Sequence, residues 1–132
     1  MTLDLSHRKI AVVGGDAREQ EIARLAASTG ATVTAYGFPW PAEGIPGVEL
    51  ATSPEEAMRG ADYALFPIPG QADNGDLFAP HAPAPIRPNR ELLSVMARPA
   101  AIILGWANDE LKATAEELGI SLSEYESDTE LM

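Results

Sequence analysis

The residues best suited to chemistry follow an apolar run near the start of the chain. Residues 10–13 lead into Gly14, Gly15 and Asp16, and Arg18 comes two residues later. Two glycines permit a sharp turn, and a helix that begins after it points unpaired backbone N–H groups at whatever lies there. With the cation of Arg18 beside it, this turn predicts a site for a small carboxylate.

Two other interpretations of the same turn compete with a carboxylate site. In the first, Arg18 is a surface residue paired with Glu19 or Glu21. In the second, the turn binds a dinucleotide, but the pattern G-x-G-x-x-G requires glycine at positions 16 and 19, which are Asp16 and Glu19. The acid expected near the end of the second strand is also missing, because the chain there reads Tyr-Gly-Phe at residues 36–38. The sequence therefore disfavours nucleotide binding by this turn.

Several other chemistries are excluded by residue type. The chain has no cysteine, which removes disulfides, thiolate zinc sites and thiol nucleophiles. His7 and His81 have no second histidine or carboxylate at ligand spacing, so no metal site is expected. No serine occupies a G-x-S-x-G turn, and no pair of carboxylates for proton transfer can be identified, so the catalytic residues stay unknown.

Composition narrows the class of protein. A chain of 132 residues with 45% hydrophobic content predicts a single domain over residues 1–132. Its formal charge of -11 argues against nucleic acid and anionic membranes as partners, since both attract positive charge. No apolar run approaches the roughly 20 residues that span a bilayer, and no signal peptide is recognisable. A cytoplasmic location is expected.

The elements that must position these residues alternate along the chain. Apolar or β-branched runs predict strands at residues 10–13, 32–36, 48–51, 61–66, 100–104 and 120–125, and capping residues start helices after Asp16, Ser53, Asn89 and Asn108. This order predicts an α/β fold, a three-layer Rossmann-like or flavodoxin-like domain with a mainly parallel sheet of five to six strands and helices on both faces.

The first helix should bury an apolar stripe on this sheet. Its spacing predicts that Ile22, Leu25, Ala26 and Thr29 face inward, while Glu19, Gln20 and Arg24 face outward. Asn108 is expected to cap the last helix, and contact with a ligand is its alternative role.

In such a sheet, ligands bind outside the carboxyl ends of the strands. Three loops follow these ends, at residues 14–18, 67–88 and 105–108, and we call the edge they form the carboxyl edge. The middle loop carries six prolines, at positions 67, 69, 80, 83, 85 and 88. A segment of this length without regular structure is more often functional than a simple connector.

These loops also carry a resemblance to a known family. The run KIAVVGGDAREQEIARLAASTGATVTAYGF at residues 9–38, the sequence Pro-Ile-Pro-Gly at residues 67–70 and residues 103–108 together resemble the N-terminal domain of the dipicolinate synthase A subunit. The resemblance implies an NADP-dependent oxidoreductase of bacterial sporulation, which forms dipicolinate from a dihydrodipicolinate-type precursor. Members of this family continue into a C-terminal nucleotide-binding domain with an intact glycine fingerprint.

By this resemblance, the present chain is the substrate-side domain and the nucleotide-binding domain is absent, since the chain stops at Met132. No cofactor is expected in this chain, and NADP is implied for the full-length protein. The chain alone should be inactive, because hydride transfer needs the nicotinamide held against the substrate.

The resemblance also assigns candidate residues for a small dicarboxylate substrate. Arg18 would bind one carboxylate and the backbone amides near Gly15 another polar group, with Arg87 and Arg90 as secondary candidates. The complete substrate-binding set is Gly14, Gly15, Asp16, Arg18, Pro67, Gly70 and Asn108. The implied partners are further copies of the full-length protein, in a homo-oligomer, and a second synthase subunit. The alternative function is a non-catalytic docking or regulatory α/β module that uses the same edge.

Overall fold

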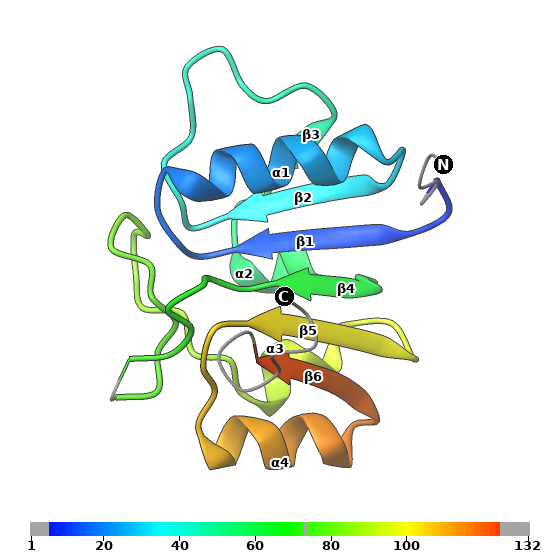
Figure 1. Ribbon diagram of the computed structural model, residues 1–132, viewed down its shortest axis with the longest axis vertical. Helices are drawn as coiled ribbons and strands as arrows, with labels where there is room; N and C mark the ends of the chain where they lie inside the picture. The colour runs from blue at the N-terminus through cyan, green and yellow to red at the C-terminus, as the bar shows by residue number, and fades with distance from the viewer. Residues whose placement is uncertain (1–5, 73, 125–132) are drawn as a thin grey trace.

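Six parallel strands form a single sheet in the order β3-β2-β1-β4-β5-β6. The computed structural model describes residues 6–72 and 74–124 (Figure 1). Its elements along the chain are β1 (Lys9–Val13), α1 (Arg18–Ser28), β2 (Thr32–Tyr36), β3 (Val48–Leu50), α2 (Pro54–Met58), β4 (Tyr63–Leu65), α3 (Arg90–Ser94), β5 (Ala100–Leu104), α4 (Asp109–Glu117) and β6 (Ile120–Glu124). The predicted Rossmann-like α/β fold is confirmed. None of the described helices is long and apolar enough to cross a membrane.

Two apolar clusters lie on opposite faces of the sheet. Ile10 and Val12 of β1 pack with residues of α1, whereas Ala11 and Val13 pack with residues of α2, α3 and α4. Strand β1 is therefore covered on both faces, as its unbroken apolar run predicts. The helix α1 contacts β1, β2 and β3, so on its side of the sheet Ala101 and Ile103 of β5 are only half-buried.

The predicted inner stripe of α1 is wrong in part. Leu25 is 59% exposed, while Glu19, Ala23 and Ala26 are buried. Residues 19, 23 and 26 also follow a helical spacing, on a face of the helix adjacent to the predicted stripe. Leu25 lies on a different face of the helix from these residues, and its side chain is therefore left exposed.

Three helix starts are built as the sequence predicts. Side-chain oxygens of Ser53, Asn89 and Asn108 accept the backbone N–H three residues later, at 3.1, 3.0 and 2.8 Å. At α1 the N-cap residue is Ala17, and Asp16 lies one position earlier, where its Oδ1 accepts the N–H of Arg18 at 3.0 Å. Each of these bonds satisfies a donor that the first helical turn leaves unpaired.

The three predicted loops meet at the carboxyl edge. The amide of Gly15 donates to the carbonyl of Phe78 at 2.7 Å, and the amide of Gly105 donates to the carbonyl of Pro67 at 3.1 Å. The amide of Gln71 donates to Trp106 O at 3.0 Å. These bonds join residues far apart in the sequence, so the edge is held by tertiary contacts (Figure 1).

Candidate functional site

The backbone amides of the glycine turn are already occupied. The N–H of Gly14 donates to Tyr36 O at 2.8 Å, and that of Gly15 donates to Phe78 O at 2.7 Å. The N–H of Asp16 donates to a carboxylate oxygen of Glu19 at 2.9 Å. These amides make their hydrogen bonds within the chain, so a polar group of a substrate at Gly15 would have to displace one of these bonds.

Glu19 closes the turn from beneath. The residue is only 2% exposed, and its Oε1 has no hydrogen-bond partner among the described residues. A side chain on Gly15 would begin 2.1 Å from the Glu19 carboxyl carbon, so the glycine is required to admit this carboxylate. The prediction that Glu19 faces outward is wrong. The spacing of Asp16 and Glu19, typical of a capping box, was the signal that could have revealed it.

Burial has an electrostatic consequence for Glu19. Removal from water disfavours the charged form and raises the pKa of the Glu19 carboxyl, although the bond from the Asp16 amide opposes this. Glu19 also stands where a dinucleotide fingerprint has its third glycine, which permits close approach of helix and strand. A buried carboxylate at this position therefore differs from the glycine that a pyrophosphate-binding turn has there.

Glu19→Gln should change how stability depends on pH. Because folding raises the pKa of Glu19, the folded state binds more protons than the unfolded state above the ordinary glutamate value of about 4.3. The free energy of unfolding of the parent chain should therefore fall, relative to the variant, as the pH rises from that value to the raised pKa. Each unit by which the pKa of Glu19 differs between the folded and unfolded states corresponds to about 1.4 kcal/mol in the free energy of unfolding. Urea unfolding of both proteins between pH 4 and pH 8 measures this, and parallel profiles would contradict it.

Arg18 forms an ion pair at the mouth of the turn. Its Nε and Nη2 donate to the two carboxylate oxygens of Asp16, at 3.0 and 3.1 Å. These bonds hold the pKa of the Asp16 carboxyl below its usual range and raise that of Arg18. The alternative of a surface arginine in an ion pair is confirmed, but the partner is Asp16. Of the two partners considered from sequence, Glu21 pairs with Arg24 and Glu19 accepts the Asp16 amide. The Arg18 side chain is 55% exposed, so a ligand can reach it.

Pro67 and Gly70 shape the edge through backbone packing. The ring of Pro67 is buried and lies 3.1 Å from the point where a side chain on Gly14 would begin. A side chain on Gly70 would begin 2.1 Å from the carbonyl oxygen of Trp106. Neither residue points a polar group at solvent, and we assign both to the support of the loops.

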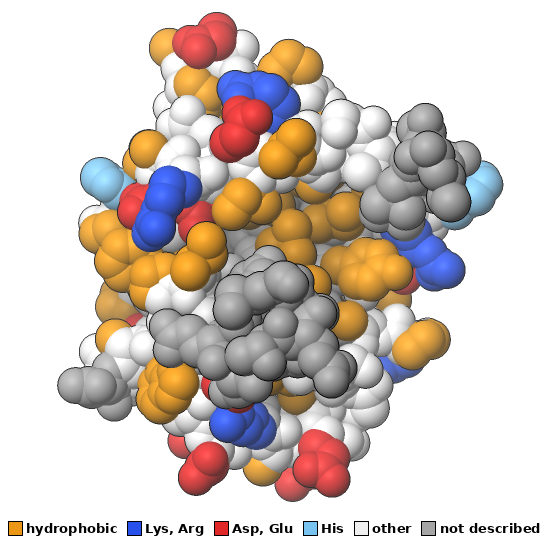
Figure 2. All heavy atoms as spheres, viewed as in Figure 1, with side chains coloured by type: hydrophobic (Ala, Val, Ile, Leu, Met, Phe, Trp, Pro, Cys, Tyr) orange, Lys and Arg blue, Asp and Glu red, His pale blue; other side chains and the backbone are white. Residues whose placement is uncertain are grey.

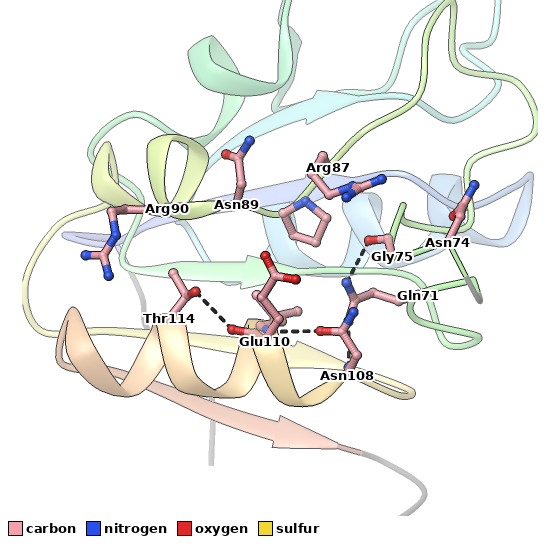
Figure 3. Close-up of a pocket in the computed structure, with 11 residues that line it drawn as sticks. Gln71, Asn74, Gly75, Arg87, Asn89, Arg90, Asn108, Glu110 and Thr114 are labelled. Carbon is pink, nitrogen blue, oxygen red and sulfur yellow. Dashed lines mark hydrogen bonds between the residues drawn. The ribbon is translucent and has the colours of Figure 1, made fainter.

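The other candidates lie in a separate pocket beside α4. This cavity of about 480 Å³ contains Asn108, Arg87 and Arg90, and we call it the α4 pocket (Figure 3). Its full lining is Gln71, Asn74, Gly75, Arg87, Pro88, Asn89, Arg90, Asn108, Glu110, Leu111 and Thr114. No residue of the first turn belongs to it, so the predicted site residues fall into two groups.

Gln71 is a buried polar residue of this pocket that the sequence did not reveal. It is 7% exposed, its Oε1 accepts the N–H of Asn108 at 2.7 Å, and its Nε2 donates to Gly75 O at 2.7 Å. The side chain therefore ties the long loop to the start of α4. No local pattern marks it, because Asn108 is 37 positions away and becomes a neighbour only in the folded chain.

We also examined side chains that could bind a metal ion in the part of the chain that the structure describes. No group of three or more His, Asp or Glu side chains there could hold a metal ion. His7 and His81 are exposed, in agreement with the sequence-based interpretation.

Comparisons with known proteins agree with this architecture. The sequence profile of the N-terminal domain of the dipicolinate synthase A subunit matches residues 9–126. Among curated proteins, no sequence match was found. The structure of the dipicolinate synthase A subunit from Bacillus halodurans superimposes with a TM-score of 0.80 at 21% identity, covering 99% of this chain and 44% of that chain. For the dipicolinate synthase A subunit from Bacillus subtilis the TM-score is 0.78 at 24% identity, over 94% of this chain and 42% of that chain.

A more distant likeness extends to dehydrogenases. D-lactate dehydrogenase from Lactobacillus jensenii, solved with NAD+, superimposes with a TM-score of 0.64 at 17% identity, over 94% of this chain and 37% of that chain. These likenesses show a shared fold, and this chain spans less than half the length of each of the three structures. The profile match covers most of the chain, and the chain therefore belongs to the family of N-terminal domains of the dipicolinate synthase A subunit.

Proposed function

We propose that this chain is the substrate-side domain of an NADP-dependent oxidoreductase that forms dipicolinate from a dihydrodipicolinate-type precursor, a cytoplasmic enzyme of bacterial sporulation. The observation that carries this proposal is the closed glycine turn. Glu19 fills the turn from beneath, and the amides that would cradle a pyrophosphate are bonded within the chain. A domain of this family whose turn is closed in this way is suited to the substrate rather than to the nucleotide.

The nucleotide would then be held outside residues 1–132. The similar structures are more than twice as long as the part that this chain covers, which leaves length for a further domain in those proteins. NADP would supply the hydride acceptor, and the residues of this chain would hold the substrate against it. On this proposal the chain alone does not catalyse oxidation.

Arg18 is the residue we propose to bind a substrate carboxylate. Its guanidinium is exposed at the carboxyl edge, and the bidentate pair with Asp16 fixes its orientation. A carboxylate of the substrate would approach the same guanidinium from solvent. Gly14, Gly15, Pro67 and Gly70 would shape the edge around it, whereas Asn108 lines the separate α4 pocket.

Arg18→Ala should weaken binding of a dicarboxylate. Loss of one charge-assisted contact is expected to raise the dissociation constant for dipicolinate about tenfold or more. Calorimetric titration of the chain with dipicolinate, and separately with NADP, measures this. Arg24→Ala removes a similarly exposed arginine on the same helix and should leave binding unchanged. Saturable binding of NADP, or equal dipicolinate binding by Arg18→Ala and the parent chain, would contradict the proposal.

Two exposed apolar side chains support the alternative of a docking module. Ile68 is 43% exposed and Trp106 is 40% exposed, and both stand in loops of the carboxyl edge. Exposed large apolar residues in adjacent loops are a common feature of protein contacts. A second synthase subunit or another copy of the full-length protein would be the partner. If neither dipicolinate nor NADP binds in the titration above, the result would favour the docking module.

A further inference from the structure

The α4 pocket contains two side-chain hydrogen-bond donors that both lie near Gly75. Asn108 uses its Oδ1 to cap α4, which leaves its Nδ2 without a partner among the described residues. Arg87 uses its Nε to bind Asp76 at 2.7 Å. The Arg87 Nη1 and the Asn108 Nδ2 each lie 3.6 Å from the position where a side chain on Gly75 would begin. Because residue 75 is glycine, it places no side chain beside these two donors.

Two N–H donors that lie near the same glycine suit the two oxygens of a carboxylate. The guanidinium carries a positive charge, and the pair with Asp76 raises its pKa further, so it stays charged throughout the physiological range. Gln71 keeps the geometry in place, because it binds both the Asn108 amide and the carbonyl of Gly75. The donors therefore belong to a supported arrangement rather than to a free surface.

The same pocket also contains a carboxylate acceptor. Figure 3 shows Glu110 directing its side chain from α4 into the space below Arg87 and Asn89. Within the described residues its carboxylate takes part in no hydrogen bond or ion pair, although it lies close enough to Arg87 to stabilise the charged guanidinium. The pocket thus presents a cation and an amide on one side and a carboxylate on another.

The charge of the surroundings argues against a ligand that is only an anion. Arg87 is paired with Asp76, and Arg90 is paired with Glu117, so both cations are already neutralised. Glu110 adds one more negative charge, and acidic side chains are prominent at the end of the molecule that carries α4 (Figure 2). These negative charges would repel a ligand that carries only carboxylate groups. They would attract the ammonium group of a ligand that carries both.

We propose that the α4 pocket binds a small α-amino carboxylate, with its carboxylate on Arg87 and Asn108 and its ammonium group on Glu110. A cavity of about 480 Å³ is large enough for such a ligand and a short side chain. This site does not depend on the proposed oxidation at the carboxyl edge, since the pocket contains no residue of the first turn.

The two ligands L-glutamate and glutarate test the proposal, because they differ only in the amino group. We expect L-glutamate to cause saturable shifts in the ¹⁵N spectrum of the chain at Gly75, Asn108 and Glu110. Glutarate should bind about tenfold more weakly, the ratio that one lost charge-assisted bond produces. Equal affinity for both ligands would overturn the zwitterionic site, and absence of saturable shifts with L-glutamate would overturn the site altogether.

Three substitutions separate the roles of the polar groups. Asn108→Ser keeps a side-chain oxygen that caps α4 but removes Nδ2, and Arg87→Gln removes the cation; each should weaken L-glutamate binding about tenfold. Glu110→Gln should weaken L-glutamate and strengthen glutarate, so that the two affinities converge. Arg24→Gln is the control and should change neither. Unchanged L-glutamate binding in Asn108→Ser or Arg87→Gln would overturn the assigned contacts.

The location of the shifts distinguishes this site from the proposed function. Dipicolinate is expected to shift the resonances of Arg18 and its neighbours, and L-glutamate is expected to shift those of the α4 pocket. Shifts by L-glutamate at residues 14–18 with none at Gly75 or Asn108 would overturn the pocket and leave the proposal for Arg18 standing. Conversely, loss of dipicolinate binding would not alter the result for L-glutamate.

Discussion

Gly105→Ala is expected to destabilise the chain by about 3 kcal/mol or more, because the added methyl group has no space. A side chain at this position would begin 1.2 Å from the carbonyl oxygen of Ile68, which belongs to the backbone and cannot turn away. The bond from the Gly105 amide to Pro67 O would be lost as the two loops separate. Chemical denaturation with urea, followed by circular dichroism, measures the loss.

Gly60→Ala is the matched control for this substitution. Gly60 has a positive φ of 71°, but a side chain there would meet no atom within 4 Å. It should therefore cost only the backbone strain of a left-handed residue, about 1 to 2 kcal/mol. Equal losses in the two variants would show that the contact between the loops of Ile68 and Gly105 does not constrain the carboxyl edge.

Gln71→Ala is the second substitution with a large expected effect, a loss of about 2 to 4 kcal/mol in the free energy of unfolding. Truncation removes the acceptor of the Asn108 amide and the donor to Gly75 O, and it leaves both groups without a partner in a poorly hydrated place. A small cavity adds to the cost. The amide resonances of Gly75 and Asn108 should move together, since one side chain holds both.

Gln20→Ala provides the comparison for Gln71. Its Nε2 also makes a bond to a backbone carbonyl, that of Pro39 at 2.8 Å, but the residue is only partly buried. Water can replace the lost partner there, so the expected cost is below about 1 kcal/mol. If Gln71→Ala proves as mild as Gln20→Ala, then Gln71 does not support the wall of the α4 pocket.

The two groups of candidate residues have different consequences for function. The first turn combines an exposed arginine with a closed backbone, so the ligand contact that we propose there depends on the side chain of Arg18. The α4 pocket combines donors and an acceptor around an open space. A ligand proposed at the first turn would compete with Asp16 for Arg18, whereas the ligand proposed at the α4 pocket would compete with water for the side-chain Nδ2 of Asn108 and for Glu110.

Local patterns were sufficient to predict the elements of this protein. Apolar runs marked the strands, and Ser53, Asn89 and Asn108 marked three helix starts, because a cap involves residues only three positions apart. The alternation of strands and helices then predicted a parallel sheet and the meeting of three loops at its carboxyl edge, since right-handed crossovers leave few other arrangements. The resemblance to the family was likewise recognised from sequence motifs that include these loops.

Only the tertiary structure decided what the side chains do at that edge. Glu19 is buried because Gly15 and the small residues of α1 open a space beneath the turn, and its outward placement by helical periodicity was therefore wrong. Gln71 joins Gly75 of its own loop to Asn108 of a distant segment. The Asn108 oxygen caps the helix α4, and the residue lines the α4 pocket. Such contacts depend on packing between distant segments, which periodicity and capping patterns do not encode.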